Sequence, residues 1–340
     1  MFIFGKKKGR QLERKVLDDK RKFGRLDEVN KLVINTSSIN VNFIQSDSTD
    51  IEVYLHGIGY IKGEITFNTE LIKGTLQIDL DFTGHLINSS ITLDISIPKE
   101  KKLNGIDINS TSSDMDIRKI TSNYIDVKTS SGDVSIHDST ILEEARISAT
   151  TGDIEVEKSS LASLNIKSSS SDVDICFTSV KKDIAVETVS GCITIDGGSA
   201  DSIKVKSSSG DVELDHFEVR KDIFIETTTG DVDISNNVSA EEFNIKTSSG
   251  DIYTSAILKK AVIETTTGDV DAEIDALDDI SLRISTRSGD VNVELNNIKT
   301  LQISPKTRNG YVDVDCSYNG KYNAELIIET TTGGIEIGDL

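Results

Sequence analysis

The chain has 340 residues, enough for two ordinary domains or for one elongated repeat domain. It carries 37 Lys and Arg against 57 Asp and Glu, and this net charge of −20 argues against nucleic-acid binding by the bulk of the chain. No apolar run approaches the ~20 residues of a membrane-spanning helix. Three Cys, four His and no Trp leave little material for a metal site or a thiol enzyme, so we expect no cofactor.

Residues 1–31 form a basic tail. They hold 11 basic and 5 acidic side chains, whereas the remaining residues have a net charge of −26. The apolar start, residues 1–4, is shorter than the roughly 7–15 residues of a signal-peptide core, and the basic residues follow it instead of preceding it. We therefore expect a cytoplasmic protein, and three Cys without framework spacing agree with a reducing compartment.

The tail has three interpretations. It is a solvated extension, with a fraying helix from Gln11 to Lys31; or it binds an acidic protein surface, including the acidic body of this same chain; or it is a membrane foot. A short apolar insert beside a polybasic patch is the two-signal arrangement that peripheral anchoring needs. The residues of this proposed foot are Phe2, Ile3, Phe4, Lys6, Lys7 and Lys8.

Residues 32–100 are expected to form a β-rich N-terminal cap. Apolar residues alternate there, as in Ile51-Glu52-Val53-Tyr54-Leu55, which indicates half-buried strands. A repeat fold needs such a cap because a bare end exposes a strand edge. Pro98 and the basic run that follows it mark the junction to the regular repeats.

Residues 101–340 repeat the phrase Thr-Ser-Ser-Gly-Asp-Val-x-Ile with close variants. Twelve copies lie between residues 113 and 333, with a mean spacing of 20 residues. The Gly of each copy is expected to anchor a turn, where it supplies a positive φ. The anchors are Gly132, Gly152, Gly191, Gly210, Gly230, Gly250, Gly268, Gly289, Gly310 and Gly333, with Ser113 and Ser171 in the same slot.

The repeat predicts an all-β fold. Alternating segments flank each anchor, and a unit of this size buries its apolar face only when neighbouring units cover it. We therefore predict a single-stranded β-solenoid, similar to a parallel β-helix, with ~20-residue coils ~4.8 Å apart. Inward pairs precede each anchor, as in Ile203 and Val205, and a further inward plug follows about nine residues after it. The plugs are Leu161, Val180, Val219, Leu277 and Ile298.

The outward position four residues before the anchor carries alternating charge from Lys167 to Glu264. Stacked in parallel, each charge would face opposite charges above and below, and such pairs contribute roughly 0.2–1 kcal/mol each. The pattern predicts that coils stack in sequence order. Pro305 is expected to distort its coil, and the last copy, Glu325–Ile337, is expected to form an exposed end for association between molecules.

These repeats, behind an alternating segment that closes on Ile97-Pro98, resemble the bacterial putative-adhesin β-strand-repeat family of domain-of-unknown-function β-solenoid proteins. The resemblance covers about residues 30–337. It implies a β-solenoid, no established enzyme activity, and a link to the cell envelope or to surface attachment. Residues 1–8 also resemble the N-terminal membrane tails of bactofilin-type cytoskeletal solenoids.

An acidic column follows the anchors. Carboxylates stacked ~4.8 Å apart repel one another, and bound Ca²⁺ would relieve that repulsion. The alternative is that each Asp accepts a turn amide. The weak Ca²⁺ candidates are Asp211, Asp231, Asp251 and Asp269.

No catalytic constellation is visible in the sequence. The acidic residues recur in every coil instead of converging, and the four His and three Cys fall at unrelated repeat positions. We therefore expect a non-enzymatic scaffold or interaction protein of the adhesin type, cytoplasmic and tethered to the inner face of the membrane. Its expected partners are a protein, a second copy through the solenoid ends, or an anionic membrane, and not nucleic acid. The alternatives are a surface adhesin that binds glycan or protein, a bactofilin-like self-assembling element and, least favoured, a β-helix enzyme that acts on polysaccharide.

Overall fold

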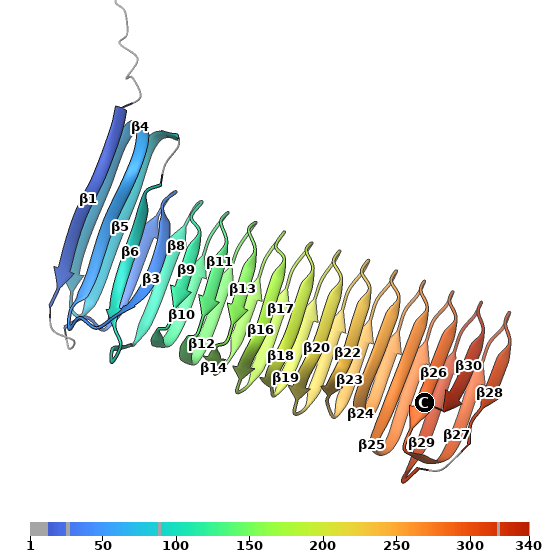
Figure 1. The fold of residues 1–340 in the computed structure, drawn as a ribbon. Coiled ribbons are helices and arrows are strands. Elements are labelled where there is room, and N and C mark those ends of the chain that lie inside the picture. Colours follow the sequence, from blue (N-terminus) through green and yellow to red (C-terminus); the bar gives the residue numbers. More distant parts are fainter. Residues whose placement is uncertain (1–12, 25–27, 88–89, 318–319, 340) are drawn as a thin grey trace, which may run out of the picture.

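The computed structural model describes residues 13–24, 28–87, 90–317 and 320–339, and over these the chain winds into one long β-solenoid (Figure 1). The described residues form thirty strands and no helix. Most of the strands are parallel and in register with the equivalent strand of the neighbouring coil. The predicted all-β solenoid with coils of about 20 residues is confirmed.

The strands that precede the turn anchors form the pre-turn ladder. In the regular coils it contains β8 (Gly105–Ser110), β10 (Thr121–Lys128), β12 (Thr140–Ser148), β15 (Leu164–Lys167), β17 (Asp183–Glu187), β19 (Ser202–Lys206), β21 (Asp222–Glu226) and β23 (Glu242–Lys246). Two short strands, β7 (Lys102–Leu103) and β14 (Ser160–Leu161), pair beside it.

The strands that follow the anchors form the post-turn ladder. It contains β9 (Met115–Arg118), β11 (Val134–His137), β13 (Ile154–Glu157), β16 (Val173–Val180), β18 (Ile193–Ala200), β20 (Val212–Val219) and β22 (Val232–Ser239). Two long strands, β24 (Ile252–Glu264) and β25 (Val270–Ser285), pass through the corner and belong to both ladders.

Aliphatic columns fill the space between the ladders. The predicted inward pairs are buried, as Ile203, Val205, Phe243 and Ile245 show with exposures of 0–1%. Most of the predicted plugs are buried as well, but Leu277 is 44% exposed, so that prediction is wrong. The ladder between β24 and β25 shifts register at this corner, and Ala276 and Ile280 face the interior in its place.

The charged outward column holds the register in the middle of the rod. Lys167 donates to Glu187 over 2.8 Å, and Lys206 donates to Glu226 over 2.5 Å. These ammonium groups lower the pKa of Glu187 and Glu226. All four side chains are 42–61% exposed, so each pair adds only about 0.2–1 kcal/mol. A shift of the stacking by one coil would bring like charges together, so the column disfavours that misregister.

The N-terminal cap consists of β1 (Glu13–Phe23), β2 (Lys31–Thr36), β3 (Asn40–Ser46), β4 (Ile51–Ile72), β5 (Thr75–Ile87) and β6 (Thr92–Pro98). β2 and β3 stack directly on β8 and β9, and β5 and β6 stack outside them. β4 runs antiparallel across both β5 and β6, and β1 pairs with the first half of β4. The outermost strand at this end is therefore β1 (Figure 1).

The helix expected from Gln11 to Lys31 is wrong where the structure describes it, because β1 is an extended strand. Its basic side chains are used by the fold. Lys20 and Lys22 both pair with Glu52, at 2.6 and 2.7 Å. Arg21 pairs with Asp19 and stacks over Phe67, with 3.9 Å from the guanidinium carbon to the ring centre. Much of the basic tail is therefore part of the cap.

The coils at the C-terminal end do not stack in sequence order. The segments there are β26 (Val291–Asn296), β27 (Ile298–Lys306), β28 (Val312–Asp315), β29 (Tyr322–Glu329) and β30 (Ile335–Asp339). β29 lies between β25 and β27, and β30 lies between β26 and β28 (Figure 1). The last copy of the repeat therefore lies between the two copies that precede it in the sequence. Both predictions made for this region, sequence-ordered stacking and an exposed last copy, are wrong.

Pro305 gives the physical reason for this order. The carbonyl of Lys306 accepts the amide of Thr330, the residue that follows β29, so the backbone of Lys306 faces β29 and that of Pro305 faces the open side. A proline has no N–H to give a neighbouring strand, so it is tolerated on an edge and not in the middle of a ladder. Its pairing with Ile328 is regular, and the predicted distortion at Pro305 is absent from the β27–β29 register. The irregularity lies instead between Ile298 and Thr300.

Candidate functional site

The acidic column forms a chain of turn caps. The Oδ1 atom of each Asp accepts the backbone N–H of the equivalent residue in the next coil. Asp211 accepts from Asp231 over 2.9 Å, Asp231 from Asp251 over 2.8 Å, and Asp251 from Asp269 over 2.8 Å. The hydrogen bond therefore joins neighbouring coils instead of closing a turn within one coil. It accounts for an Asp at this position without a cation.

Ca²⁺ binding on Asp211, Asp231, Asp251 and Asp269 stays a prediction. Each carboxylate keeps its second oxygen outside this chain of hydrogen bonds, but a column of exposed carboxylates is common without an ion. A calcium titration of the melting temperature tests it, and no shift at millimolar Ca²⁺ would reject it.

The turn anchors meet their neighbours' backbones closely. Six of the ten predicted glycines have a positive φ: Gly132, Gly152, Gly191, Gly268, Gly289 and Gly333. The prediction of a positive φ is wrong for the other four, which are Gly210, Gly230, Gly250 and Gly310. A side chain is excluded there for a different reason, because a Cβ would lie 1.8–2.2 Å from a carbonyl oxygen of the adjacent coil. The positive φ and the close approach of the adjacent coil both explain why glycine stands at the anchors, and both are requirements of the fold.

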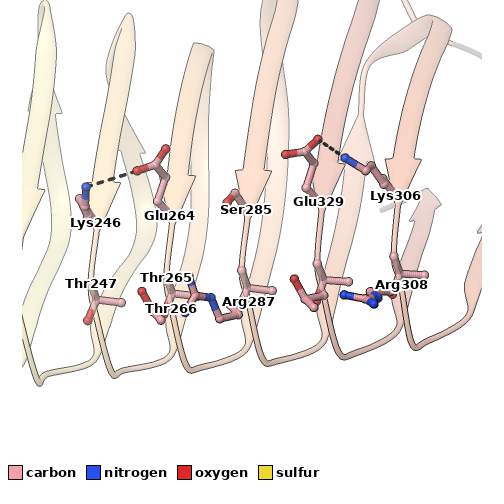
Figure 2. Close-up of a pocket in the computed structure, with 14 residues that line it drawn as sticks. Lys246, Thr247, Glu264, Thr265, Thr266, Ser285, Arg287, Lys306, Arg308 and Glu329 are labelled. Carbon is pink, nitrogen blue, oxygen red and sulfur yellow. Dashed lines mark hydrogen bonds and ion pairs between the residues drawn. The ribbon is translucent and has the colours of Figure 1, made fainter.

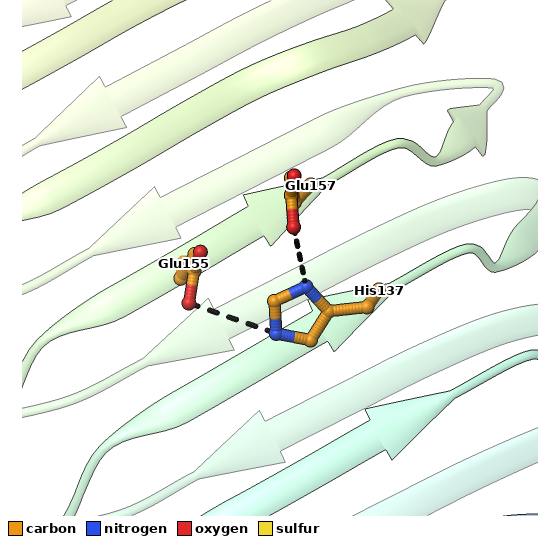
Figure 3. A group of neighbouring side chains, drawn as sticks. All are labelled: His137, Glu155 and Glu157. Carbon is orange, nitrogen blue, oxygen red and sulfur yellow. Dashed lines mark hydrogen bonds and ion pairs between the residues drawn. The ribbon is translucent and has the colours of Figure 1, made fainter.

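His137 lies between two carboxylates, a cluster that reasoning from the sequence missed (Figure 3). Its Nδ1 is 3.2 Å from Glu157 and its Nε2 is 3.6 Å from Glu155. Aligning the repeats would have found the cluster, because His137 and Glu157 occupy the same position in adjacent coils. Lys158 also pairs with Glu157 and lowers its pKa. Each polar group of the cluster therefore has a partner within it, and the lysine–glutamate contact is an ordinary surface ion pair.

The next coil places Cys176 in register with Glu157, so His137 and Cys176 are two coils, or about 10 Å, apart. That separation is too long for a base to take the thiol proton. Burial raises the pKa of the Cys176 thiol, and the neighbouring Asp174 adds to the rise. A catalytic cysteine needs the opposite shift, because the thiolate is the nucleophile.

A groove of about 710 Å³ crosses the last five coils on the pre-turn side of the turns (Figure 2). Lys246 pairs with Glu264 at 3.6 Å, and Lys306 pairs with Glu329 at 3.5 Å. The insertion of the last copy creates the second of these pairs, because it brings β29 against β27. The charged residues of the groove are Lys246, Glu264, Arg287, Lys306, Arg308 and Glu329.

Arg287 and Arg308 stand apart from those pairs. Both are exposed, and neither side chain makes a hydrogen bond or ion pair with any residue that the structure describes. Each occupies the position two residues before its anchor. In the other ten copies this position holds Thr111, Ser130, Thr150, Ser169, Val189, Ser208, Thr228, Ser248, Thr266 and Thr331. A comparison of this one position across the twelve copies would have found both arginines in the sequence.

The proposed membrane foot, Phe2, Ile3, Phe4, Lys6, Lys7 and Lys8, lies outside the described residues. In the part of the chain that the structure does describe, no helix has the length and apolar character needed to cross a membrane.

Residues 29–215 and 192–339 each match the family model described as Toastrack DUF4097. Comparison with curated proteins gives no match. Among solved structures, the chain is similar to a putative cell adhesion protein from Clostridium sporogenes, with 11% identity, a TM-score of 0.23, and coverage of 96% of this chain and 100% of that one. A putative adhesin from Bacteroides fragilis has 14% identity and a TM-score of 0.25, and one from Parabacteroides distasonis has 12% and 0.31; each match covers 95% of this chain and 97% of the other. Similarities at this level carry no argument about what this chain binds.

Proposed function

Because the chain belongs to the Toastrack family DUF4097, we propose that it is a non-enzymatic β-solenoid that acts as a scaffold or interaction protein. The observation that carries the proposal is the distribution of polar side chains. Asp caps, hydroxyls and Lys–Glu pairs recur coil after coil, as expected for groups that hold the repeat together. Burial raises the pKa of the Cys176 thiol, which is the opposite of what a nucleophilic cysteine needs.

The same proposal includes a cytoplasmic location and a tether to the inner face of the membrane through residues 1–8. Three arguments support the tether. The six proposed contact residues combine an apolar insert with a polybasic patch. Lys20, Arg21, Lys22 and Lys31 have acidic partners in the fold, so their charge is balanced within the cap, and the basic cluster proposed for the membrane is Lys6–Lys8. β1 is the outermost strand of the cap, so the chain enters the rod at one extreme end (Figure 1).

Flotation with anionic vesicles tests the tether. The full chain is expected to float and to be released by salt, whereas Lys6→Glu/Lys7→Glu/Lys8→Glu is expected to stay unbound. Each basic residue near an anionic surface contributes ~1 kcal/mol, so losing three costs about 3 kcal/mol, roughly a hundredfold in partition.

The matched control is Lys181→Glu/Lys182→Glu, two exposed lysines in the middle of the rod. It should float like the unmodified chain. Equal flotation of the triple variant, or loss of flotation in the control, would contradict a tether at residues 1–8.

Self-assembly through the C-terminal end is not part of this proposal. The terminal strand β27 presents Pro305 to its open side, which removes a backbone donor from the edge. The terminal coil still exposes Val312 and Val314, by 43% and 41%, but charged Asp313 and Asp315 alternate with them. These are devices that protect an edge from pairing with another chain.

A further inference from the structure

We propose that the groove across the last five coils binds a linear acidic polysaccharide, and that Arg287 and Arg308 hold two of its carboxylates. The proposal rests on the non-enzymatic interaction surface of the proposed function, for which it names a partner, and it does not rest on the cytoplasmic location. It does not depend on the membrane tether, which uses residues 1–8 and none of the residues that line the groove.

The first argument is that neither arginine side chain makes a hydrogen bond or an ion pair with the described residues. In a solenoid, the inward columns and the turn anchors decide whether a coil stacks. The position two residues before the anchor is exposed in every copy, and ten copies fill it without a charge. The two guanidinium groups have no partner among the described residues, and both line the same groove.

The second argument is their spacing. Thr332 pairs with Ser288 on one side and with Asn309 on the other, so Thr331 lies between Arg287 and Arg308. The two arginines are therefore two coils, or about 10 Å, apart. A guanidinium group binds a carboxylate through two parallel hydrogen bonds. This arrangement suits a polymer whose acidic groups recur along an extended chain lying across the coils.

The third argument is local charge. The groove has four cationic and two acidic side chains, a net of two positive charges, on a body whose net charge is −26. An acidic ligand is repelled by most of this surface and attracted here, which directs it to one place. Proteins that bind single-stranded nucleic acid commonly stack its bases on aromatic side chains, and none of the residues that line the groove is aromatic.

The fourth argument favours a saccharide over an acidic peptide. Peptides commonly dock by adding a strand to an open sheet edge. From β23 to β29, every strand of the pre-turn ladder already has a neighbour on both sides. The groove offers hydroxyl groups instead. Those of Thr266, Ser285 and Thr331 line it without a hydrogen-bond partner among the described residues, and they match the hydroxyls of a sugar chain.

Calorimetric titration with polygalacturonate oligomers tests the proposal on the full chain. The probe carries a carboxylate on each sugar, and its methyl ester has the same backbone without charge. We expect the acid form to bind, the ester to bind at least tenfold more weakly, and added salt to weaken binding. The variant Arg287→Ser/Arg308→Thr restores the repeat consensus and should weaken binding at least tenfold without lowering the melting temperature.

The control Lys181→Ser/Lys182→Ser removes the same charge from another face and should bind within twofold of the unmodified chain. Absence of binding, or equal weakening in both variants, would overturn the proposal. Tighter binding of poly-L-glutamate through the same two arginines would overturn the assignment of a saccharide ligand and identify an acidic peptide as the ligand. A failed vesicle flotation beside a positive titration would reject the tether alone.

Discussion

Gly191→Ala is expected to lower the free energy of unfolding by about 3 kcal/mol or more. Gly191 has a φ of +119°, and a Cβ there would lie 2.0 Å from the carbonyl oxygen of Ser171 and 2.5 Å from its carbonyl carbon. The left-handed backbone alone costs an L-residue roughly 1–2 kcal/mol, and the overlap involves backbone of the adjacent coil, which moves only if the stack opens. Guanidinium denaturation followed by circular dichroism measures the loss.

The shape of the unfolding curve is a second result. Each coil contacts only its neighbours, so weakening one central contact uncouples the two halves of the rod. We expect a broadened or two-step transition for Gly191→Ala. The control is Gly338→Ala, because the nearest atom to its Cβ is 3.8 Å away and its φ is not left-handed. A loss as large at Gly338 as at Gly191 would contradict close coil contact at the anchors.

Phe243→Ala is expected to cost about 3–5 kcal/mol, the usual range for a large aromatic removed from a core. Phe243 is fully buried in an interior column, where it stacks between Ile223 and Ala261. The matched control is Phe224→Ala in the adjacent strand. Phe224 faces outward beneath Lys204 and Lys206, whose ammonium groups lie 5.9 and 5.5 Å from its ring centre. Its removal should cost about 1 kcal/mol or less.

Thermal or chemical unfolding of the two variants compares the two faces of neighbouring strands with the same substitution. A larger loss at Phe224 than at Phe243 would mean that the strands are turned the other way, with every side chain on the wrong face.

The regular part of the fold was predictable because its pattern is redundant. Ile203 and Val205 recur as equivalent pairs in most copies, so a single mistaken copy does not change the period. The strand β1 was not predictable in the same way. Its run of Lys, Arg, Asp and Leu suits a helix, and only its pairing with β4, about 40 residues later, makes it a strand.

The order of the last coils was predicted wrongly for a related reason. Ile303 and Leu326 occupy the same position in their two copies and both suit the interior column, so near-identical copies do not say which one comes next. Pro305 carries the information, because a proline within a strand marks an edge position as well as a distortion. The groove was missed with it, since Arg287, Thr331 and Arg308 become neighbours only in the inserted order.

Disulfide trapping tests that inserted order most directly. In a chain whose Cys176, Cys192 and Cys316 are replaced by Ser, Ser285→Cys/Glu329→Cys joins positions that the structure pairs in register. Ser285→Cys/Lys306→Cys joins positions two coils apart, because Glu329 lies between them. A disulfide needs Cα atoms within about 7 Å, and the two spacings are ~4.8 and ~9.6 Å. The account predicts that the first pair oxidises and the second does not. A bridge in the second pair and none in the first would mean that the coils stack in sequence order and that the groove is not built as described.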